Sequence, residues 1–408
     1  MTIVNAPDVA DVVSLGESMV TFLPTRPGRL ADVPSFDRAI GGAESNVACA
    51  LAAAGHAVRW VSRVGADGFG DHLVETVGSY GVDVSGVRRD VSRPTGVYFR
   101  TAGERGTAAH EVAYYRAGSA ASAMTVGNVE VGAGRVLHLS GITAALSSGC
   151  LELMQSLTAP REGRPVVSFD VNHRSGLWRD ADGARVLREL ARGADVVFVG
   201  EDEAEEVWGV TGGPSAVREV LPEPAVLVVK QGAEGATAFV SAAGRRGLVA
   251  QFPAPLGSVS APESPPQAAG AAPAHPPSCG QSCRWGGTGG RSGTPQARAS
   301  ETAPTATPTS RTFEPAPTVD VVSTTGAGDA FAAGFLSGLL RGLPVGTSLR
   351  TGHLWAAAAL TVPGDLATPP SRAHADQLVA LDEPAWERLR LGPGWTQAAQ
   401  APEEVRTP

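Results

Sequence analysis

Short apolar runs rich in β-branched residues alternate with helix-like stretches along most of the chain. The apolar runs have the length and composition of buried strands. They lie at 12–15, 60–62, 136–139, 166–169, 196–199 and 226–229. The helix candidates lie at 43–54, 68–80, 182–192 and 329–341. This order predicts repeated strand, helix, strand units, and hence a three-layer α/β/α fold with a mostly parallel central sheet and helices on both faces.

Polar residues and glycines directly follow several of the predicted strands. Asp170 and Asn172 follow one strand, Gly200 and Glu201 follow the next, and the segment 230–232 follows the last. In open α/β sheets, ligands bind outside the carboxyl ends of the strands. We therefore expect the functional site at this edge of the sheet.

The segment 95–119 does not follow this alternation of strands and helices. Val97 and Phe99 are spaced by two residues, as are Val112, Tyr114 and Arg116 further along. A spacing of two is typical of strands, because side chains two residues apart lie on the same face. The pattern predicts a hairpin, which we interpret as a small β flap, or lid, over the site.

The segment 253–312 is rich in Pro, Ala and Gly, and 13 of the 31 prolines of the chain lie between residues 253 and 317. It has few large apolar side chains to offset the entropy lost on ordering, so we predict a disordered insertion. Similar sequences flank it, Phe-Pro-Ala-Pro at 252–255 and Phe-Glu-Pro-Ala-Pro at 313–317. We expect one folded domain made of 12–252 and 313–385, with a disordered N-terminal tail at 1–11 and a C-terminal tail at 386–408.

Charge and composition narrow the range of partners. The formal net charge of −8 and the absence of a basic stripe argue against nucleic-acid binding. No apolar run is long enough to cross a bilayer, and no charged-then-apolar leader opens the chain. The four cysteines form no disulfide pattern, and His275, Cys279 and Cys283 in the insertion offer too few ligands for a structural metal. We expect a cytoplasmic protein with a small-molecule partner, and homo-oligomer formation stays open.

The strongest chemical signal lies at 324–335, Thr-Thr-Gly-Ala-Gly-Asp-Ala-Phe-Ala-Ala-Gly-Phe. Small residues end at Asp329, which opens an apolar helix, so unpaired backbone N–H groups and the positive helix end converge beside one carboxylate. This arrangement suits phosphoryl transfer. The N–H groups of Gly326, Ala327 and Gly328 form an anion hole for the migrating group, and Asp329 takes the proton of the attacking hydroxyl.

This segment resembles the second signature of the ribokinase-like (PfkB) carbohydrate kinases, and the segment 41–48, Gly-Gly-Ala-Glu-Ser-Asn-Val-Ala, resembles the first. The motifs at 114–120, 137–143, 170–174 and 364–365 are similar to those of 2-keto-3-deoxygluconate kinases. The resemblance covers most of 12–370 outside the insertion. It implies a ribokinase-like fold and transfer of a phosphoryl group from Mg-ATP to a hydroxyl of a sugar acid.

The resemblance also implies roles for individual residues. On the substrate side it implies contacts from Gly42, Ala43, Asn46, Tyr98, Tyr114, Arg116, Arg174 and Asp365. On the ATP side it implies contacts from Asn172, Arg174, Lys230, Gly232, Gly235, Gly326, Gly328 and His353. Glu203 stands where the family has a glutamate that helps to hold Mg²⁺ through water. Arg116 would supply the two-pronged donor that a substrate carboxylate needs.

Three residues depart from the family pattern. Gly200 replaces the Asn of an Asn-x-x-Glu motif, Ser323 replaces the Asp before the second signature, and His353 replaces an Asn near the adenine. Because Ser323 lacks the charge that helps to bind a monovalent cation in the family, dependence on such a cation stays open.

The sequence also bears on functions of other classes. A P-loop kinase is excluded because no Gly-x-x-x-x-Gly-Lys motif exists and Lys230 is the only lysine. A dinucleotide-dependent oxidoreductase would need a glycine fingerprint where Gly16-Glu17-Ser18-Met19 stands. A fructokinase or other neutral-sugar kinase and a catalytically silent sugar-binding protein stay open as alternatives.

Overall fold

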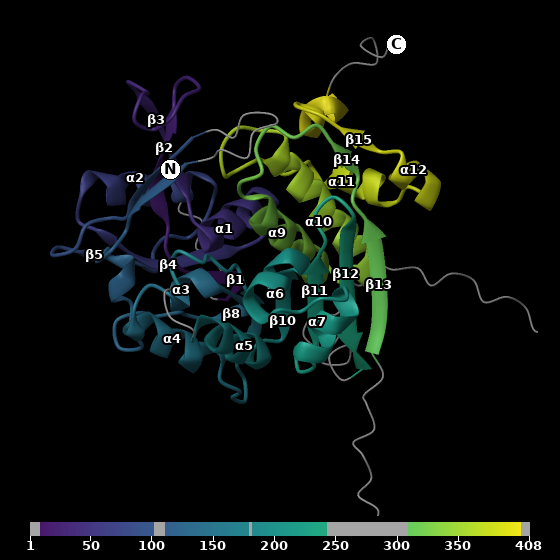
Figure 1. Ribbon diagram of the computed structural model, residues 1–408, viewed down its shortest axis with the longest axis horizontal. Coiled ribbons are helices and arrows are strands. Elements are labelled where there is room, and N and C mark those ends of the chain that lie inside the picture. The colour runs from purple at the N-terminus through teal and green to yellow at the C-terminus, as the bar shows by residue number, and fades with distance from the viewer. Residues whose placement is uncertain (1–8, 102–110, 179–181, 243–308, 401–408) are drawn as a thin grey trace, which may run out of the picture. The chain divides into compact units, whose positions relative to one another are not determined.

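The computed structural model describes residues 9–101, 111–178, 182–242 and 309–400. Its main sheet has nine strands in the order β13-β12-β11-β10-β9-β8-β1-β4-β5 (Figure 1). These strands are β1 Ala10–Leu15, β4 Val58–Gly65, β5 Val87–Asp90, β8 Gly134–Ser140, β9 Val166–Asp170, β10 Val196–Gly200, β11 Val226–Lys230, β12 Gly235–Ser241 and β13 Thr309–Pro315. All neighbours from β5 to β11 pair in parallel, and β12 and β13 extend the sheet in antiparallel pairing. The six strands expected from the sequence are all present.

Helices cover both faces of this sheet. One face packs against α1 Ala43–Ala53, α2 Gly68–Ser79, α9 Ala327–Leu340 and α10 Val345–Leu360. The other packs against α4 Ser148–Thr158, α5 Gly183–Gly193, α6 Glu201–Trp208 and α7 Pro214–Val220. The shorter elements are α3 Gly141–Ala144, η1 Ala121–Ala123, α11 Arg372–Val379, α12 Glu383–Glu387, η2 Trp395–Gln400 and the strand pair β14 Thr318–Val319 and β15 Arg390–Leu391. The α/β class predicted from the sequence is confirmed.

The alternation of side chains along each strand explains the three layers. In β10, Val196 and Phe198 belong to the core under α9 and α10, whereas Val197 and Val199 belong to the core under α5 and α6. Successive side chains of a strand point to opposite faces. A strand that is apolar throughout therefore contributes to two cores, and this is why the pattern reads as a continuous apolar run.

The order of the strands reverses at β1. The chain passes from β1 to β4 and β5 on one side, and then returns to β8 on the other side of β1 before it continues to β11. A crevice forms outside the carboxyl ends of the strands where the order reverses in this way. Glu17 follows β1 at this place, and Asp170 ends β9 nearby.

The flap is a four-stranded sheet in the order β3-β2-β6-β7. Its strands are β2 Met19–Pro24, β3 Phe36–Gly41, β6 Val97–Arg100 and β7 Val112–Tyr115. The predicted hairpin is present as β6 and β7, with Tyr98 opposite Tyr114. The sequence pattern missed β2 and β3, which pair with each other and attach to β6. The flap sheet is therefore twice as wide as expected.

The end of the predicted insertion requires a correction. Residues from Thr309 to Pro315 form β13, and Thr309 pairs with Ser241 at the end of β12. The folded domain thus resumes before residue 313. Residues 243–308, which contain most of the predicted insertion, lie outside the described residues. The two strand ends on either side of this stretch lie side by side as paired neighbours, at the spacing of a hairpin.

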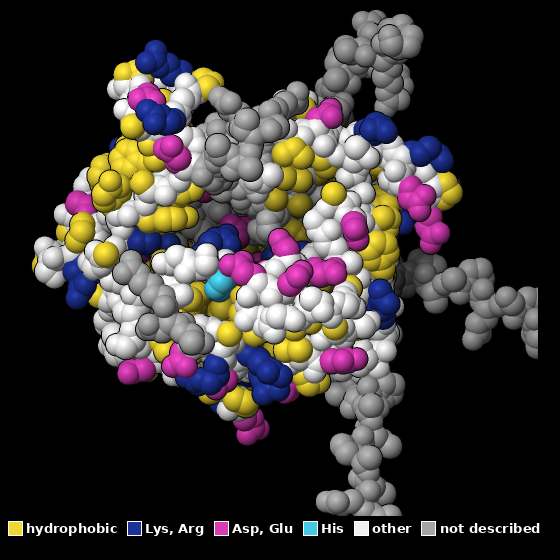
Figure 2. All heavy atoms as spheres, in the orientation of Figure 1, with side chains coloured by type: hydrophobic (Ala, Val, Ile, Leu, Met, Phe, Trp, Pro, Cys, Tyr) yellow, Lys and Arg dark blue, Asp and Glu magenta, His cyan; other side chains and the backbone are white. Residues whose placement is uncertain are grey.

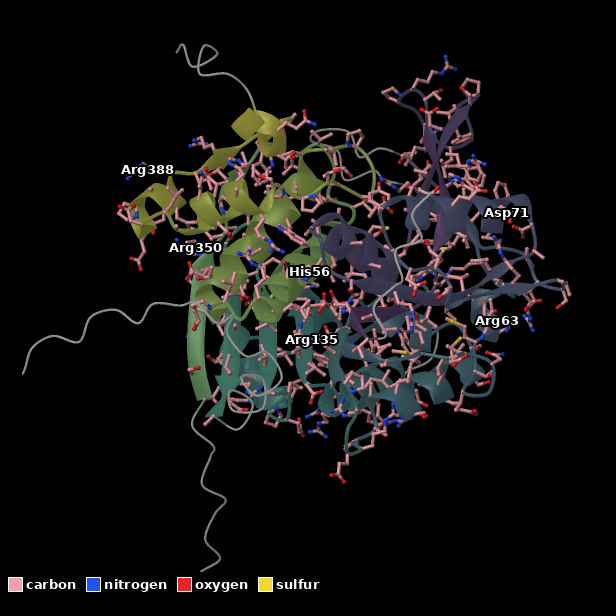
Figure 3. The ribbon with its side chains drawn as sticks, turned by 180° about the vertical axis from the view of Figure 1, so that it is seen from behind. His56, Arg63, Asp71, Arg135, Arg350 and Arg388 are labelled. Atoms are coloured by element: carbon pink, nitrogen blue, oxygen red, sulfur yellow. The ribbon has the colours of Figure 1, made fainter. Side chains whose placement is uncertain are left out.

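The prediction of a tail from residue 386 is wrong. Trp386 is fully buried, and its indole Nε1–H donates a hydrogen bond of 2.8 Å to the carbonyl of Pro315. The guanidinium carbon of Arg350 lies 4.8 Å from the ring centroid of Trp386, and β15 pairs with β14. Figure 3 shows Arg350 and Arg388 on this side of the molecule. The N-terminal boundary also shifts, because β1 begins at Ala10 and the undescribed residues at this end of the chain are 1–8.

Among the described residues, no helix has both the length and the apolar character needed to cross a membrane.

Candidate active site

The first turn of α9 builds one wall of the site. Gly326 precedes the helix with φ of +77°, a left-handed conformation that glycine adopts without strain. A Cβ atom at Gly326 would lie 2.1 Å from the carbonyl oxygen of Asp365, so a larger residue does not fit. No side chain caps this helix end. The N–H groups of the first turn are therefore without a side-chain cap, and such a helix start favours the binding of an anion.

Asp329 lies in this first turn and is partly buried. Its Oδ2 accepts a hydrogen bond of 2.8 Å from Asn46 Nδ2, and its Oδ1 lies 3.4 Å from Asn172 Nδ2. Burial raises the pKa of Asp329 to about 7, and the Asn46 hydrogen bond opposes this rise. A carboxyl group with a pKa near 7 can take up a proton at neutral pH, as a general base must.

Two further features fix the surroundings of Asp329. Asn172 follows β9 with φ of +42°, an uncommon conformation for a residue other than glycine, and this turns its amide toward Asp329. Arg174 is exposed, but its charge lies near enough to lower the pKa of Asp329. The structure thus brings together three residues that the sequence predicted separately.

The start of α1 forms a second wall of the site, beside α9. A Cβ atom at Gly42 would lie 2.4 Å from the carbonyl oxygen of Glu17, so the close approach of these two segments requires glycine. Ala43 begins the helix, and Asn46 follows one turn later with its amide on Asp329. Asn46 Oδ1 is buried, and no donor among the described residues meets it. This oxygen can accept a hydrogen bond from a ligand hydroxyl.

Lys230 and two carboxylates form the polar floor at the ends of β9 to β11. Lys230 Nζ donates to Asp170 Oδ2 at 2.9 Å, and it lies close to the backbone of Gly328, where a Cβ atom would be 3.5 Å away. Burial opposes the charge of Lys230, but Asp170 and Glu203 outweigh that effect and raise its pKa. The ammonium group therefore stays charged beside the anion hole.

Glu203 is held by backbone donors. It accepts hydrogen bonds from Gly200 N–H at 3.0 Å and from His173 N–H. Burial raises the pKa of Glu203, whereas Lys230 lowers it. In the part of the chain that the structure describes, no three His, Cys, Asp or Glu side chains form a metal-binding group. Mg²⁺ that arrives on phosphate groups needs only one or two protein carboxylates, and Glu203 and Asp170 fit that smaller role.

Three residues expected on the ATP side differ in their contacts. Gly232 has φ of +58° and open space around its Cα, as a ligand-facing turn would have. Gly235 instead packs against β13, where a Cβ atom would lie 2.4 Å from the carbonyl oxygen of Glu314. His353 is buried, and its Nε2 lies 3.0 Å from the same carbonyl oxygen. Burial lowers the pKa of His353 to about 4, so the ring is neutral.

Asp365 connects the flap to the anion hole. Its Oδ1 accepts a hydrogen bond of 2.7 Å from Arg100, and its Oδ2 accepts one from Tyr98. Its backbone carbonyl packs on Gly326, as described above, and the side chains of Tyr98 and Asp365 leave no room for a Cβ atom at Gly41. Both carboxylate oxygens of Asp365 have protein donors, and its predicted contact with the substrate stays a prediction. Arg100 was missed, because no local pattern pairs it with a residue so distant in sequence.

The remaining flap residues lie near the start of α1. Tyr114 is half exposed, and its ring centroid lies 5.5 Å from that of Tyr98. The guanidinium carbon of Arg116 lies 5.7 Å from the centroid of Tyr114. Arg116 forms an ion pair with Glu17, whose other oxygen accepts a hydrogen bond of 2.5 Å from Ser119. Glu17 was missed as a site residue, although its place directly after β1 is a signal that could have found it.

The space-filling view shows that this face of the molecule is hollowed, with basic and acidic side chains gathered around the hollow (Figure 2). A kinase site needs basic side chains to bind the anionic phosphate groups and a carboxylate nearby to accept the proton.

Comparison with known proteins shows the family to which this chain is similar. The profile described as "pfkB family carbohydrate kinase" matches residues 9–255 and 303–372, so it skips the centre of the predicted insertion. A 2-dehydro-3-deoxygluconokinase of Bacillus subtilis (strain 168) is 32% identical over 371 residues, which cover 89% of this chain and 93% of the relative. Fructokinase-1 of Oryza sativa subsp. japonica is 33% identical over 55% of this chain and 71% of the relative. The crystal structure of a PfkB protein from Polaromonas sp. JS666 is similar with a TM-score of 0.65 and 28% identity, and the match covers 90% of this chain and 99% of that one.

Proposed function

The chain belongs to the pfkB family of carbohydrate kinases, and we propose that it transfers the γ-phosphoryl group of ATP to a hydroxyl of a sugar acid, 2-dehydro-3-deoxygluconate. The observation that carries the chemistry is Asp329, a carboxyl group with a pKa of about 7 at an uncapped helix start. The similarity to the Bacillus subtilis kinase over nearly its whole length favours the sugar acid as substrate.

The reaction follows from the two walls of the site. A substrate hydroxyl donates to Asn46 Oδ1 or lies beside it, within reach of Asp329. Its proton passes to the Asp329 carboxylate as its oxygen attacks the γ-phosphorus of ATP. The bond from the γ-phosphorus to the bridging oxygen breaks, and ADP leaves. The first-turn N–H groups of α9 and the Lys230 ammonium stabilise the charge on the migrating group.

The phosphate side is supported by residues that the fold brings to the ends of β9 to β11. Lys230 lies beside Gly328, and Asn172 and Arg174 lie beside Asp329. Glu203, through water, and Asp170 are the residues that would hold Mg²⁺. When bound with ATP, this ion supplies positive charge that offsets the charge of the phosphate groups.

Arg116 is the residue that supports an anionic substrate. A carboxylate transferred from water into a pocket needs a cation or several donors to offset its lost hydration. Arg116 is on the flap beside Tyr114, and its Nε is buried without a hydrogen-bond acceptor among the described residues. This donor has no protein acceptor among the described residues, and a substrate carboxylate would supply one.

A fructokinase is the second candidate. The similarity to the rice fructokinase and the existing ion pair of Arg116 with Glu17 favour it, because a paired arginine leaves the pocket without net charge. A neutral sugar needs only hydroxyl partners, and such a pocket can supply them.

Steady-state kinetics with ATP and each of the two sugars separate these candidates. We expect kcat/KM to be higher for 2-dehydro-3-deoxygluconate than for fructose by at least about tenfold, the usual effect of one charged hydrogen bond. The double variant Glu17→Gln/Arg116→Gln removes both charges without leaving either one buried and unpaired. It should lose most of this preference. A wild type that prefers fructose would overturn the choice of substrate, and the assignment to the family would stand.

A further inference from the structure

Glu17 carries a buried carboxylate for which the proposed reaction has no use. It follows β1 at the point where the strand order reverses, and its side chain is fully buried. One carboxylate oxygen contacts the Arg116 guanidinium and the other accepts the Ser119 hydroxyl. Its backbone carbonyl packs against Gly42 at the start of α1. Glu17 thus contacts both the flap and the sugar side of the site.

The ion pair leaves Arg116 with unused donors. Its side chain is 10% exposed, so its charge needs a counter-ion inside the protein. Glu17 contacts one terminal nitrogen of Arg116, Nη2. The Nε atom is buried and meets no acceptor among the described residues. A guanidinium group has five N–H donors in a flat fork, and one carboxylate does not use them all.

Glu44 is a second buried acid whose pKa responds to the charge of Arg116, but among the described residues the ion pair of Arg116 is with Glu17. Its Oε1 accepts hydrogen bonds from Ser140 at 2.8 Å and Thr143 at 2.7 Å. Burial raises the pKa of Glu44, and Arg116 acts on it only as a weaker opposing charge. The carboxylate that balances Arg116 in the described residues is therefore that of Glu17.

We propose that Glu17 is a specificity-determining residue that shares Arg116 with the substrate and limits how strongly the site binds an anion. This inference rests on the proposed function, in which Arg116 meets the carboxylate of a sugar acid. An incoming carboxylate gains the free donors of Arg116, but it also meets the negative charge of Glu17 across the same guanidinium group. The binding of a neutral sugar is changed by neither the attraction of Arg116 nor the repulsion of Glu17.

The consequence is a change in substrate preference when the charge of Glu17 is removed. Glu17→Gln keeps the shape of the side chain and an oxygen that can accept from Ser119. It removes the protein counter-ion of Arg116, so that the substrate carboxylate becomes the counter-ion. Removing one like charge a few ångströms from an anion in a partly dry site increases affinity on the order of tenfold.

The test compares the wild type, Glu17→Gln and the matched control Glu152→Gln, an exposed residue of α4. Calorimetric titration gives Kd for 2-dehydro-3-deoxygluconate and for fructose, and steady-state kinetics give KM and kcat for both. We expect Glu17→Gln to lower Kd and KM for the sugar acid about tenfold, with changes for fructose below about threefold. Glu152→Gln should change neither value.

Two results would overturn the inference, and both differ from failure of the proposed function. Equal effects on both sugars would make Glu17 a structural residue only. Weaker binding of the sugar acid alone would mean that Glu17 orients Arg116 rather than competing for it. Failure of the proposed function would already be visible in the wild type, as a preference for fructose. If Glu17→Gln does not fold, Glu17→Asp retains the charge but withdraws it by one methylene, and it should shift the preference in the same direction by a smaller factor.

Discussion

Replacing Asp329 with asparagine should make the protein more stable at alkaline pH while it removes the proposed base. Burial raises the pKa of Asp329 to about 7 from its ordinary value of 3.8, so the fold disfavours the ionised form. The unfolded chain ionises this group near pH 4, whereas the folded protein retains the proton until about pH 7. The wild type therefore loses stability as the pH rises through this window, and the loss is complete above pH 7.

The size of the effect follows from the two pKa values. Their difference corresponds to about 4 kcal/mol at 1.36 kcal/mol for each pH unit. Asp329 is only partly buried, so water screens its charge and the effect is smaller than this upper bound. We expect Asp329→Asn to raise the free energy of unfolding by about 1 to 3 kcal/mol at pH 8, and by less than about 0.5 kcal/mol at pH 4.

Urea unfolding of the two proteins at pH 4, 6 and 8 measures this difference. Asp37→Asn is the matched control, because Asp37 is an exposed residue of β3 on the flap. Comparison at each pH cancels the contributions of all other titrating groups. A stability gain that is the same at pH 4 and pH 8, or a loss at pH 8, would refute the reasoning that burial of the charge is costly.

Two further predictions concern the fold. Replacing residues 243–307 with a short glycine-rich turn should leave kcat within about threefold of the wild type, because β12 and β13 already pair at both ends of this stretch; loss of soluble, active protein would show that the stretch is structural. Arg100→Met should destabilise the protein by about 3 to 5 kcal/mol in urea unfolding, because it leaves the buried Asp365 carboxylate without its cation. Adding Asp365→Asn to Arg100→Met should recover part of the lost stability. As a control, Arg29→Met, which removes an exposed ion pair with Asp32, should change the stability by less than about 1 kcal/mol. A loss below 1 kcal/mol for Arg100→Met would contradict the role of this pair.

The parts of the fold that depend on local pattern could be predicted from the sequence. Strands buried on both faces are apolar throughout, and the helices between them are long enough to recognise, so β1, β8 to β11, α1 and α9 were expected close to where they lie. The segment at 324–335 joins a turn, a helix start and a carboxylate within a few residues. Its chemical role could therefore be predicted without knowledge of the fold.

The parts that depend on distant contacts could not be predicted. β2 and β3 are short and mixed in polarity, and they become strands because they pair with each other and with the hairpin. Trp386 was predicted to lie in a tail, because its contacts with Pro315 and Arg350 form only in the tertiary structure. Glu17 pairs with Arg116, almost one hundred positions away in the sequence, so no local pattern indicates this pair.

The glycines illustrate the same limit. Gly326 and Gly235 both looked like residues that admit a ligand. The contacts at Gly326 include a backbone carbonyl next to the anion hole, whereas those at Gly235 belong to β13. A sequence shows where the chain needs glycine, but the neighbour that excludes a side chain is a property of the tertiary structure.

The role of Asp329 is tested most directly by the turnover of Asp329→Asn with ATP and 2-dehydro-3-deoxygluconate. We expect kcat to fall by roughly 10²- to 10⁴-fold while Kd for ATP and for the sugar acid stays within about threefold of the wild type. Because the pKa of Asp329 is about 7, kcat/KM of the wild type should also fall about tenfold for each pH unit below this value, and the residual activity of the variant should lack this dependence. Near-normal turnover in Asp329→Asn, or an unchanged pH profile, would show that another group takes the proton.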